Sequence, residues 1–226
     1  MADGQPILLA WSGGKDCLMA LDRLLADPRW DVVGLLTTLD RSTDRVAMHD
    51  VRGSVLRAQA TALRLPLIEM PIDWPAPNDV YLAAFAAALA SAQRTTPGLV
   101  HIAFGDLFLD DLRRWREAAL ERIGWKAEFP LWNEPTRALA SAFVDAGHRA
   151  IVTTVDLERL PEAFCGREFD ASLLAELPQG ADACGENGEF HTLCHAGPLF
   201  ATALALVRGQ MTTRMQRFRC LDLELG

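Results

Sequence analysis

Short, mainly apolar runs that alternate with helical patterns are the feature that most constrains the fold of this chain. The runs are residues 7–10, 32–38, 67–70 and 99–104, and a segment with apolar residues at helical spacing follows each of them. A near-continuous apolar run is typical of a strand that is buried on both faces. Strands that alternate with helices predict an α/β fold with a parallel sheet and helices on both faces.

The helices predicted after these strands each have one apolar face. The first follows Gly14, the second covers residues 50–64, the third starts with Asn78 as its N-cap, and the fourth follows Asp106. The residues expected to face the core are Leu18, Leu21 and Leu25; Val51, Val55, Ala58 and Ala62; Tyr81, Phe85, Ala88, Leu89 and Ala92; and Leu112, Trp115, Ala119 and Ile123.

The character of the sequence changes after about residue 125. A β-branched run at residues 150–155 and weak alternation over residues 202–224 predict further strands. We therefore expect two domains, residues 1–128 with the parallel sheet and residues 129–226 as a smaller α+β domain.

The composition argues against some functions. The chain has 226 residues and a formal net charge of −8, which disfavours non-specific binding to nucleic acid or to an anionic membrane surface. Its five cysteines form no C-x-x-C pair, which favours reduced thiols over a disulfide framework. The N-terminus lacks a signal-peptide pattern and no apolar run has membrane-spanning length, so a soluble, cytoplasmic protein is expected.

The first strand leads into a glycine-containing turn, Ser-Gly-Gly-Lys-Asp at residues 12–16, which opens the first helix. Such a turn presents backbone N–H groups and the positive end of a helix dipole to an anion. Gly13 and Gly14 would let the backbone approach a phosphate, and Lys15 would extend its ammonium over it. The spacing fits neither G-x-x-x-x-G-K-[ST] nor G-x-G-x-x-G. The alternative is a plain turn in which the glycines serve only compactness.

This turn resembles the SGGxDS signature of the PP-loop ATP pyrophosphatases, within the adenine nucleotide alpha hydrolase superfamily. The resemblance implies a Rossmann-like (HUP-type) ATP-binding domain over residues 1–128, and cleavage of ATP into AMP and pyrophosphate. Cys17 stands where the family usually has serine, and a thiol is a weaker donor. A helix N-terminus tends to lower a thiol pKa, but this place in the motif predicts phosphate binding rather than nucleophilic attack. The implied nucleotide-binding residues are Ser12, Gly13, Gly14, Lys15, Asp16 and Cys17.

Two further segments follow predicted strands and therefore lie at the same sheet edge as the turn. His49 is in the loop after residues 32–38, and Gly105-Asp106 follows residues 99–104. We expect all three residues to contribute to the nucleotide site, with Asp16 or Asp106 binding Mg²⁺ that accompanies the phosphates. The competing interpretations are a solvated loop histidine and a helix-capping aspartate.

A second informative stretch is Cys-Gly-Glu-Asn-Gly-Glu-Phe-His-Thr at residues 184–192. With it, the chain resembles the diphthine–ammonia ligase family of PP-loop ATP pyrophosphatases, which amidates a modified histidine of translation elongation factor 2. Phe190-His191 replaces the Tyr-Glu common in the eukaryotic enzymes, and the alanine- and arginine-rich composition is typical of a bacterial member, so the acceptor is left open. The matching pieces are residues 12–16, 104–107, 130–132, 166–167, 184–192 and 197–200.

The resemblance implies an ATP-dependent amide-forming ligase. It would adenylate a substrate carboxylate, release pyrophosphate and transfer ammonia or an amine, with residues 129–226 as the substrate-binding and catalytic domain. The catalytic candidates are Lys15, Glu186, Glu189 and His191, the glutamates serving as amine binders or general bases. The expected partners are ATP, an unidentified carboxylate acceptor on a small molecule or a protein, and an ammonia or amine donor, without membrane or nucleic acid. A homodimer is left open.

Three alternatives stay open at this point. Cys184, His191, Cys194 and His195 could bind zinc, although the C-x6-H-x2-C-H spacing matches no standard site. The chain could be a nucleotide-binding regulatory module without turnover, an interpretation that Cys17 motivates. It could also be an RNA-modifying PP-loop enzyme, which the acidic charge and the missing C-x-x-C disfavour.

Overall fold

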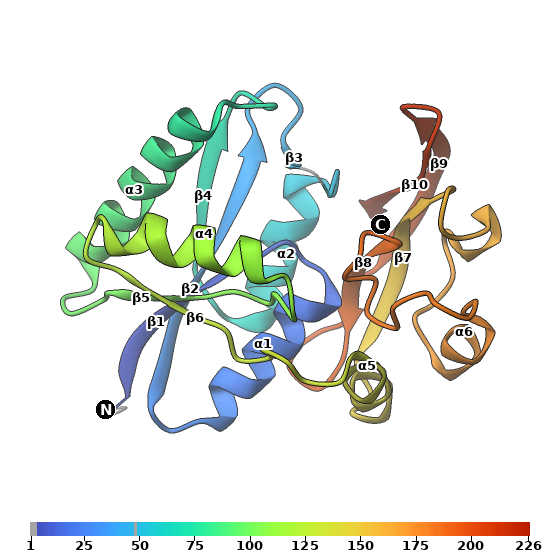
Figure 1. Ribbon diagram of the computed structural model, residues 1–226, viewed down its shortest axis with the longest axis horizontal. Coiled ribbons are helices and arrows are strands. Elements are labelled where there is room, and N and C mark those ends of the chain that lie inside the picture. The colour runs from blue at the N-terminus through green and yellow to red at the C-terminus, as the bar shows by residue number, and fades with distance from the viewer. Residues whose placement is uncertain (1–3, 48) are drawn as a thin grey trace.

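The computed structural model describes residues 4–47 and 49–226 and contains two β-sheets with helices around them (Figure 1). The larger sheet comprises β1 (Gln5–Ala10), β2 (Trp30–Asp40), β3 (Arg45–Val46), β4 (Leu67–Ile72), β5 (His101–Ala103) and β6 (Lys126–Glu128). The smaller sheet comprises β7 (Arg149–Asp156), β8 (Phe190–Ala196), β9 (Leu206–Arg214) and β10 (Phe218–Leu225). The helices are α1 (Lys15–Ala26), α2 (Gly53–Leu63), α3 (Asn78–Thr95), α4 (Asp110–Glu121), α5 (Thr136–Asp145) and α6 (Ala171–Glu176), with a 3-10 turn η1 (Glu162–Phe164).

The larger sheet is parallel apart from the two-residue strand β3, so the predicted parallel α/β sheet is confirmed. β1 lies between β2 and β5, β4 pairs with β2 beyond it, and β6 pairs with β5 on the other side. Chain order therefore reverses at β1. In open parallel sheets this switch point, at the carboxyl ends of the strands, is where ligands bind.

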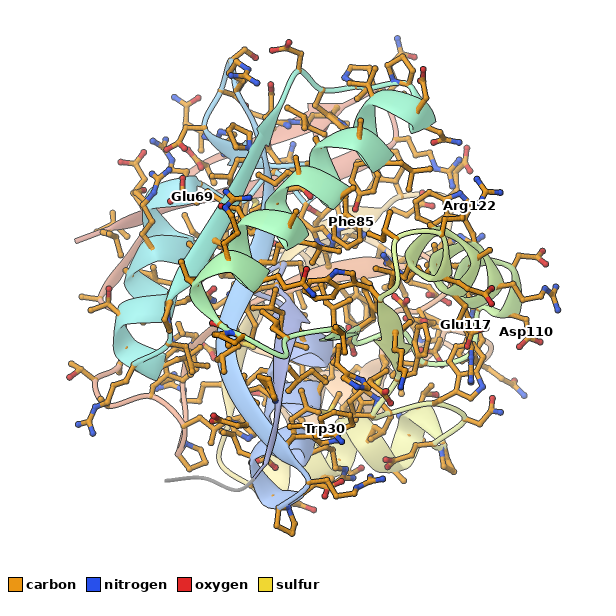
Figure 2. The ribbon with its side chains drawn as sticks, turned by 90° about the vertical axis from the view of Figure 1, so that its left-hand side faces the viewer. Trp30, Glu69, Phe85, Asp110, Glu117 and Arg122 are labelled. Atoms are coloured by element: carbon orange, nitrogen blue, oxygen red, sulfur yellow. The ribbon has the colours of Figure 1, made fainter. Side chains whose placement is uncertain are left out.

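Strand β1 supplies side chains to two hydrophobic cores. Ile7 and Leu9 belong to the core that includes residues of α1 and α2, whereas Leu8 belongs to the core with α3 and α4. Successive side chains of a strand point to opposite faces, so one short strand serves both cores. In Figure 2, α3 crosses in front of the sheet with Phe85 near it, while Asp110 of α4 lies at the outside.

The core on the α1 and α2 side continues into the C-terminal part of the chain. It includes Leu18 of α1, Leu56 of α2 and Leu193 of β8, all 0% exposed. The smaller sheet is antiparallel in the order β8-β7-β10-β9, and β8 contacts α1. The two sheets therefore share one hydrophobic core, and the domain division at residues 128 and 129 stays a prediction.

The ends and faces of the helices differ in places from the sequence prediction. The buried face of α1 contains Leu24, while the predicted Leu25 is 53% exposed. Asn78 is the first residue of α3 and Pro77 is its N-cap, so the predicted Asn78 cap is wrong. Ile123 is 41% exposed because α4 has ended two residues earlier, at Glu121.

The second predicted helix begins at Gly53 rather than at residue 50. Its most buried positions are Val55, Leu56, Gln59 and Ala60. Val55 is buried as predicted, whereas the predicted Ala58 and Ala62 are half-buried. The predicted loop over residues 41–49 contains β3, and residue 48 lies outside the described residues. All five cysteines are free and buried. Within the part of the chain that the structure describes, no helix is both long and apolar enough to cross a membrane.

Candidate active site

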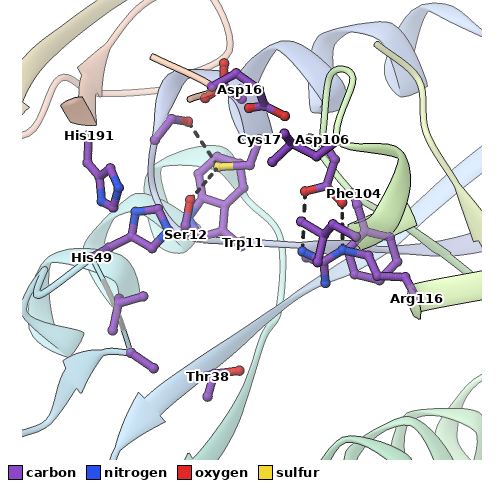
Figure 3. A pocket seen from close by; sticks show the side chains of 18 of the residues that line it. Trp11, Ser12, Asp16, Cys17, Thr38, His49, Phe104, Asp106, Arg116 and His191 are labelled. Atoms are coloured by element: carbon purple, nitrogen blue, oxygen red, sulfur yellow. Dashed lines mark hydrogen bonds and ion pairs between the residues drawn. The ribbon is translucent and has the colours of Figure 1, made fainter. Parts of the chain in front are cut away.

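A cleft of about 500 Å³ lies at the carboxyl ends of β1, β2 and β5. It brings together the turn after β1, His49, Asp106 and residues 184–192 of the C-terminal part (Figure 3). The sequence analysis had placed the first three at one sheet edge. Two of its candidates, Gly13 and Glu189, lie behind the cleft wall rather than in it.

Gln59 of α2 holds the turn from behind, and its side chain is fully buried. Its amide oxygen accepts the indole N–H of Trp11 at 2.9 Å, and its amide nitrogen donates to the carbonyls of Gly13 at 3.0 Å and Cys194 at 2.6 Å. Gly13 has a φ of +83°, and a Cβ there would lie 2.7 Å from the Gln59 amide oxygen, so only glycine fits. The sequence analysis missed Gln59, although a glutamine on the apolar face of a helix was an available signal.

Strand β8 holds the same turn from the C-terminal side. The Cys194 N–H donates to the Gly13 carbonyl at 2.8 Å, and the Lys15 N–H donates to the Thr192 hydroxyl at 3.1 Å. One of the backbone N–H groups that were expected to face a phosphate is therefore bound to Thr192. Phosphate binding by the remaining N–H groups of the turn stays a prediction.

The ammonium of Lys15 is buried instead of extending over the turn. It donates to both carboxylate oxygens of Asp16 at 2.9 Å and to the Cys184 carbonyl, and it lies 5.4 Å and 5.6 Å from the ring centres of Phe190 and Phe169. Burial is the largest single influence and lowers the pKa of Lys15. The charge and hydrogen bond of Asp16, together with the electrostatic effects of Cys184 and Glu186, outweigh burial, so this pKa is raised. The charged side chain thus connects the turn to the C-terminal loop.

Cys17 lines the cleft next to the turn, and its side chain is almost fully buried. It donates to the Gly14 carbonyl at 3.0 Å, and the Ser12 hydroxyl lies 3.7 Å from its sulfur (Figure 3). Burial raises the pKa of the Cys17 thiol to about 11, so the lowering expected from the helix N-terminus does not occur. A neutral thiol is a poor nucleophile, and this supports the prediction that Cys17 does not attack the substrate.

Asp106 lines the cleft and forms an ion pair with Arg116 of α4, at 2.6 Å and 3.3 Å (Figure 3). The Arg116 guanidinium also lies over the Phe104 ring, 4.1 Å from its centre. The N-cap of α4 is Leu109, so the interpretation of Asp106 as a helix cap is wrong. The sequence analysis missed Arg116, because nothing in the sequence distinguishes it from the other arginines of the same helix.

The two carboxylates predicted to bind Mg²⁺ already have cationic partners. Asp16 is paired with Lys15 and Asp106 with Arg116. Direct coordination would require a metal ion to displace these partners, so this arrangement does not fit Mg²⁺ held by the two aspartates. Gly105 lies against Asp16, since a Cβ on it would be 2.8 Å from the Asp16 carbonyl carbon.

Glu186 reaches the cleft from the C-terminal loop. Its Oε1 accepts the N–H of Leu107 at 2.8 Å, which joins this loop to the segment after β5. Burial raises the pKa of Glu186 to about 7; the Leu107 bond opposes this shift, while the charges of Asp16 and Asp106 add to it. A carboxyl group that titrates near neutrality is suited to general acid–base work.

The loop that carries Glu186 is built around Asp182. Its Oδ1 accepts the N–H groups of Cys184 at 2.9 Å and Glu186 at 3.1 Å. Glu189 is 2% exposed and turns inward, where its Oε1 accepts the Asp182 N–H at 3.0 Å and an amide N–H of Asn187 at 3.3 Å. The structure therefore places Glu189 where it shapes the loop, and its catalytic role stays a prediction.

His49 and His191 meet at one wall of the cleft (Figure 3). Their ring centres are 4.4 Å apart, and Nδ1 of each ring is buried without a hydrogen-bond partner in the described part of the chain. Burial and then the charge of Lys15 lower the pKa of His191 to about 4, and burial also lowers the pKa of His49. Both rings are therefore neutral near pH 7, and His49 is not the solvated loop histidine of the competing interpretation.

Another wall of the cleft is aromatic, and the sequence analysis did not assign it to the site. The Tyr81 ring lies 5.9 Å from Phe85 and 6.1 Å from Trp115. Helical spacing assigns such residues to a core, but it cannot show that this core face opens into a cleft. The aromatic residues that line the cleft here are Trp74, Tyr81, Phe85, Phe104 and Trp115.

The structure does not assemble the zinc site that the sequence left open. Cys184 donates to the Thr136 carbonyl at 3.3 Å, and His195 contacts Glu168 at 3.2 Å. Cys194 and His195 are successive residues of β8, so their side chains point to opposite faces. Among residues 4–47 and 49–226, no three His, Cys, Asp or Glu side chains are grouped to hold a metal ion.

Comparison with protein families shows what the C-terminal part of the chain is similar to. Residues 135–220 match the sequence model of the diphthamide synthase C-terminal domain. The matched segment runs from α5 into β10, and it includes Asp182, Glu186 and His191. No curated protein matches the chain significantly.

Proposed function

On the premise of a diphthine–ammonia ligase-like family, which the match over residues 135–220 supports, we propose that the chain is an ATP-dependent amide-forming ligase. In the proposed reaction ATP is converted into AMP and pyrophosphate while a carboxylate and ammonia or an amine are joined. The family match supports the general type of enzyme, and the reaction itself is the proposal.

The proposal rests mainly on the bond between Glu186 and the Leu107 N–H at 2.8 Å. This bond holds a carboxyl group with a pKa of about 7 in the same cleft as the turn after β1. Amide formation after adenylation needs a proton acceptor next to the activated carbonyl. A module that only binds a nucleotide has no use for such a group.

The walls of the cleft suggest how a nucleotide would bind. The rings of Tyr81 and Trp115 offer flat apolar surfaces for the base, and base–aromatic stacking contributes about 1–3 kcal/mol per base. The triphosphate would then lie along the turn after β1, within reach of the Arg116 guanidinium. Mg²⁺ stays part of the proposal as a companion of the phosphates.

Two steps follow from this placement. A carboxylate oxygen of the acceptor attacks the α-phosphorus, the bond from that phosphorus to the bridging oxygen breaks, and pyrophosphate leaves with the electron pair. The nitrogen of ammonia or an amine then attacks the acyl carbonyl. Glu186 accepts a proton from the nitrogen, the bond between the carbonyl carbon and the phosphate oxygen breaks, and AMP leaves.

Analysis of the nucleotide products tests the proposal. Purified protein is incubated with ATP and cell-extract fractions as the source of acceptor, and AMP, ADP and pyrophosphate are separated by chromatography. We expect AMP with pyrophosphate. Glu186→Gln should bind ATP in calorimetry but lose acceptor-dependent AMP release. Glu189→Gln is the matched control, because it makes the same change on the same loop behind the cleft wall. ADP as the sole product would rule out the proposed reaction.

A nucleotide-binding regulatory module remains the second candidate, and the position of Lys15 favours it. A lysine whose ammonium is bound to Asp16 and the Cys184 carbonyl cannot also neutralise charge on a departing pyrophosphate without leaving its partners. This candidate predicts ATP binding without acceptor-dependent AMP release in the wild-type protein, so the same experiment separates the two.

A further inference from the structure

Two imidazole rings from distant parts of the sequence lie together in the cleft. His49 comes from the loop after β3, and His191 comes from the beginning of β8. Their planes are inclined by 38° with the ring centres 4.4 Å apart, and both rings line the cleft (Figure 3). The proposed reaction steps described above use neither ring.

The buried ring nitrogens fix the positions of the protons. Nδ1 of each ring is buried and has no hydrogen-bond partner among residues 4–47 and 49–226. An orphaned N–H donor is rarer in proteins than an orphaned lone pair, so the favourable tautomer of each neutral ring carries its proton on Nε2. We assign this tautomer from the hydrogen bonding, because proton positions follow from the network. The pair therefore offers Nε2–H groups, and no charge of its own, to a ligand in the cleft.

The charges around the pair leave room for an anionic ligand, because Lys15, although paired with Asp16, still adds to burial in lowering the pKa of both rings. Lys15 is the charged residue whose field reaches both rings. Asp50, which follows His49, is ion-paired with Arg45 and Arg214 and so does not oppose an anion. Glu186, whose carboxyl group titrates near neutrality, accepts its hydrogen bond from the Leu107 N–H.

We infer that the His49–His191 pair is a binding site for a carboxylate group, which accepts hydrogen bonds from the two Nε2–H groups. This inference rests on the proposed function, in which the carboxylate belongs to the acceptor that is adenylated. The inference assigns the two reactants to different parts of the cleft. The histidine pair binds the carboxylate, and Glu186 faces the amine that will attack it.

Neutral donors suit a group whose charge changes during the reaction. The acceptor begins as a carboxylate, becomes an uncharged acyl group on adenylation, and carries an oxyanion again when the amine attacks. Fixed N–H donors that are already desolvated stabilise the developing oxyanion without reorganisation. The same pair would therefore serve both for binding and for the second step.

Nuclear magnetic resonance of ¹⁵N-histidine-labelled protein tests the inference without nucleotide or turnover. The chain has five histidines, and long-range ¹H–¹⁵N spectra report the tautomer of each. We expect His49 and His191 to be neutral with protonated Nε2. Acetate should shift the Nε2 signals of these two rings in a saturable way, while His101, His148 and His195 serve as internal controls for specificity and folding.

A phosphate titration and two His191 variants test the specificity of the acetate response. Inorganic phosphate, which represents the nucleotide phosphates, should shift the pair less than acetate at equal concentration. His191→Ala should abolish the acetate response of His49, and His191→Gln, which restores an amide donor, should recover part of it.

Nδ1-protonated rings, an absent acetate response, or a phosphate response as large as that of acetate would each overturn the inference. A protein that releases AMP but lacks the acetate response retains the proposed function and loses only this inference. A protein that shows the acetate response but releases no AMP retains the carboxylate site and loses the proposed function.

Discussion

Replacing Gln59 with leucine tests whether one buried side chain sets the shape of the turn after β1. Gln59→Leu keeps a similar volume but removes three hydrogen bonds, those to Trp11, Gly13 and Cys194. The Gly13 carbonyl keeps the Cys194 N–H at 2.8 Å, whereas the bond from the Trp11 indole N–H to Gln59 is lost.

The expected loss of stability follows from these contacts. A buried donor left unsatisfied costs about 1–3 kcal/mol, and each remaining hydrogen bond contributes about 0.5–1.5 kcal/mol net. Gln59→Leu should therefore lower the free energy of unfolding by about 3 kcal/mol, which for a chain of this size lowers Tm by about 6–12 °C. ATP affinity should fall about tenfold, because the freed turn must be reordered on binding.

Urea denaturation and calorimetry of ATP binding measure the two effects. Trp11→Phe on the Gln59→Leu background is the matched control, since it removes the unsatisfied indole donor. The double variant should be less destabilised than the sum of the single variants by about 1 kcal/mol. If Gln59→Leu stays within about 0.5 kcal/mol of wild type and binds ATP equally well, Gln59 does not set the turn and this reasoning is wrong.

Three other predictions concern titratable groups of the cleft. Lys15→Met should lower the free energy of unfolding by about 2–4 kcal/mol, because it leaves Asp16 without its cation. In urea denaturation, Lys15→Met combined with Asp16→Asn should recover most of this loss. No recovery in the double variant would contradict the ion pair. Cys17→Ser should keep or improve AMP release. Iodoacetamide should modify Cys17 of the folded wild-type protein slowly, because the pKa of this thiol is raised to about 11. Fast modification, measured by mass spectrometry, would contradict a buried neutral thiol. AMP release should rise with pH through about 7 as Glu186 loses its proton, whereas stability should fall between pH 4.5 and about 7, because the folded protein holds this proton more tightly than the unfolded chain. Glu186→Gln should remove both dependences, and an unchanged pH–rate profile would exclude Glu186 as the base.

Hydrophobic pattern was sufficient to predict β1, β2, β4 and β5 of the larger sheet, because buried parallel strands need continuous apolar runs and their connections need helices. The short strands β3 and β6 were not predicted, since neither has such a run. The common sheet edge also followed from the pattern, and it placed Ser12, His49 and Asp106 in one cleft. The exact faces of helices did not follow. At Leu24 and Leu25 the helical period allows either residue to face inward, and only packing against a particular neighbour decides.

The side-chain partners in the cleft depend on contacts that sequence spacing does not encode. Arg116 pairs with Asp106 across ten positions, while Gln59 reaches Cys194 across 135 positions. The predicted direction of the Cys17 pKa shift was wrong for the same reason. The helix N-terminus is visible in the sequence, but the burial that outweighs it comes from the tertiary fold.

The nucleotide turn and the C-terminal loop are directly connected, so a substitution in one can affect the other. The Lys15 N–H binds Thr192, the Lys15 ammonium binds the Cys184 carbonyl, and the Gly13 carbonyl binds the Cys194 N–H. Any substitution that displaces β8 or the loop around Asp182 therefore also disturbs the turn. Glu186→Gln is different, because the Glu186 carboxylate binds only the Leu107 N–H among the hydrogen bonds of the described residues, and a glutamine oxygen can accept the same bond. A loss of acceptor-dependent turnover with ATP affinity intact is thus informative at Glu186, whereas the same loss at Thr192 would not tell acceptor chemistry from a distorted nucleotide site.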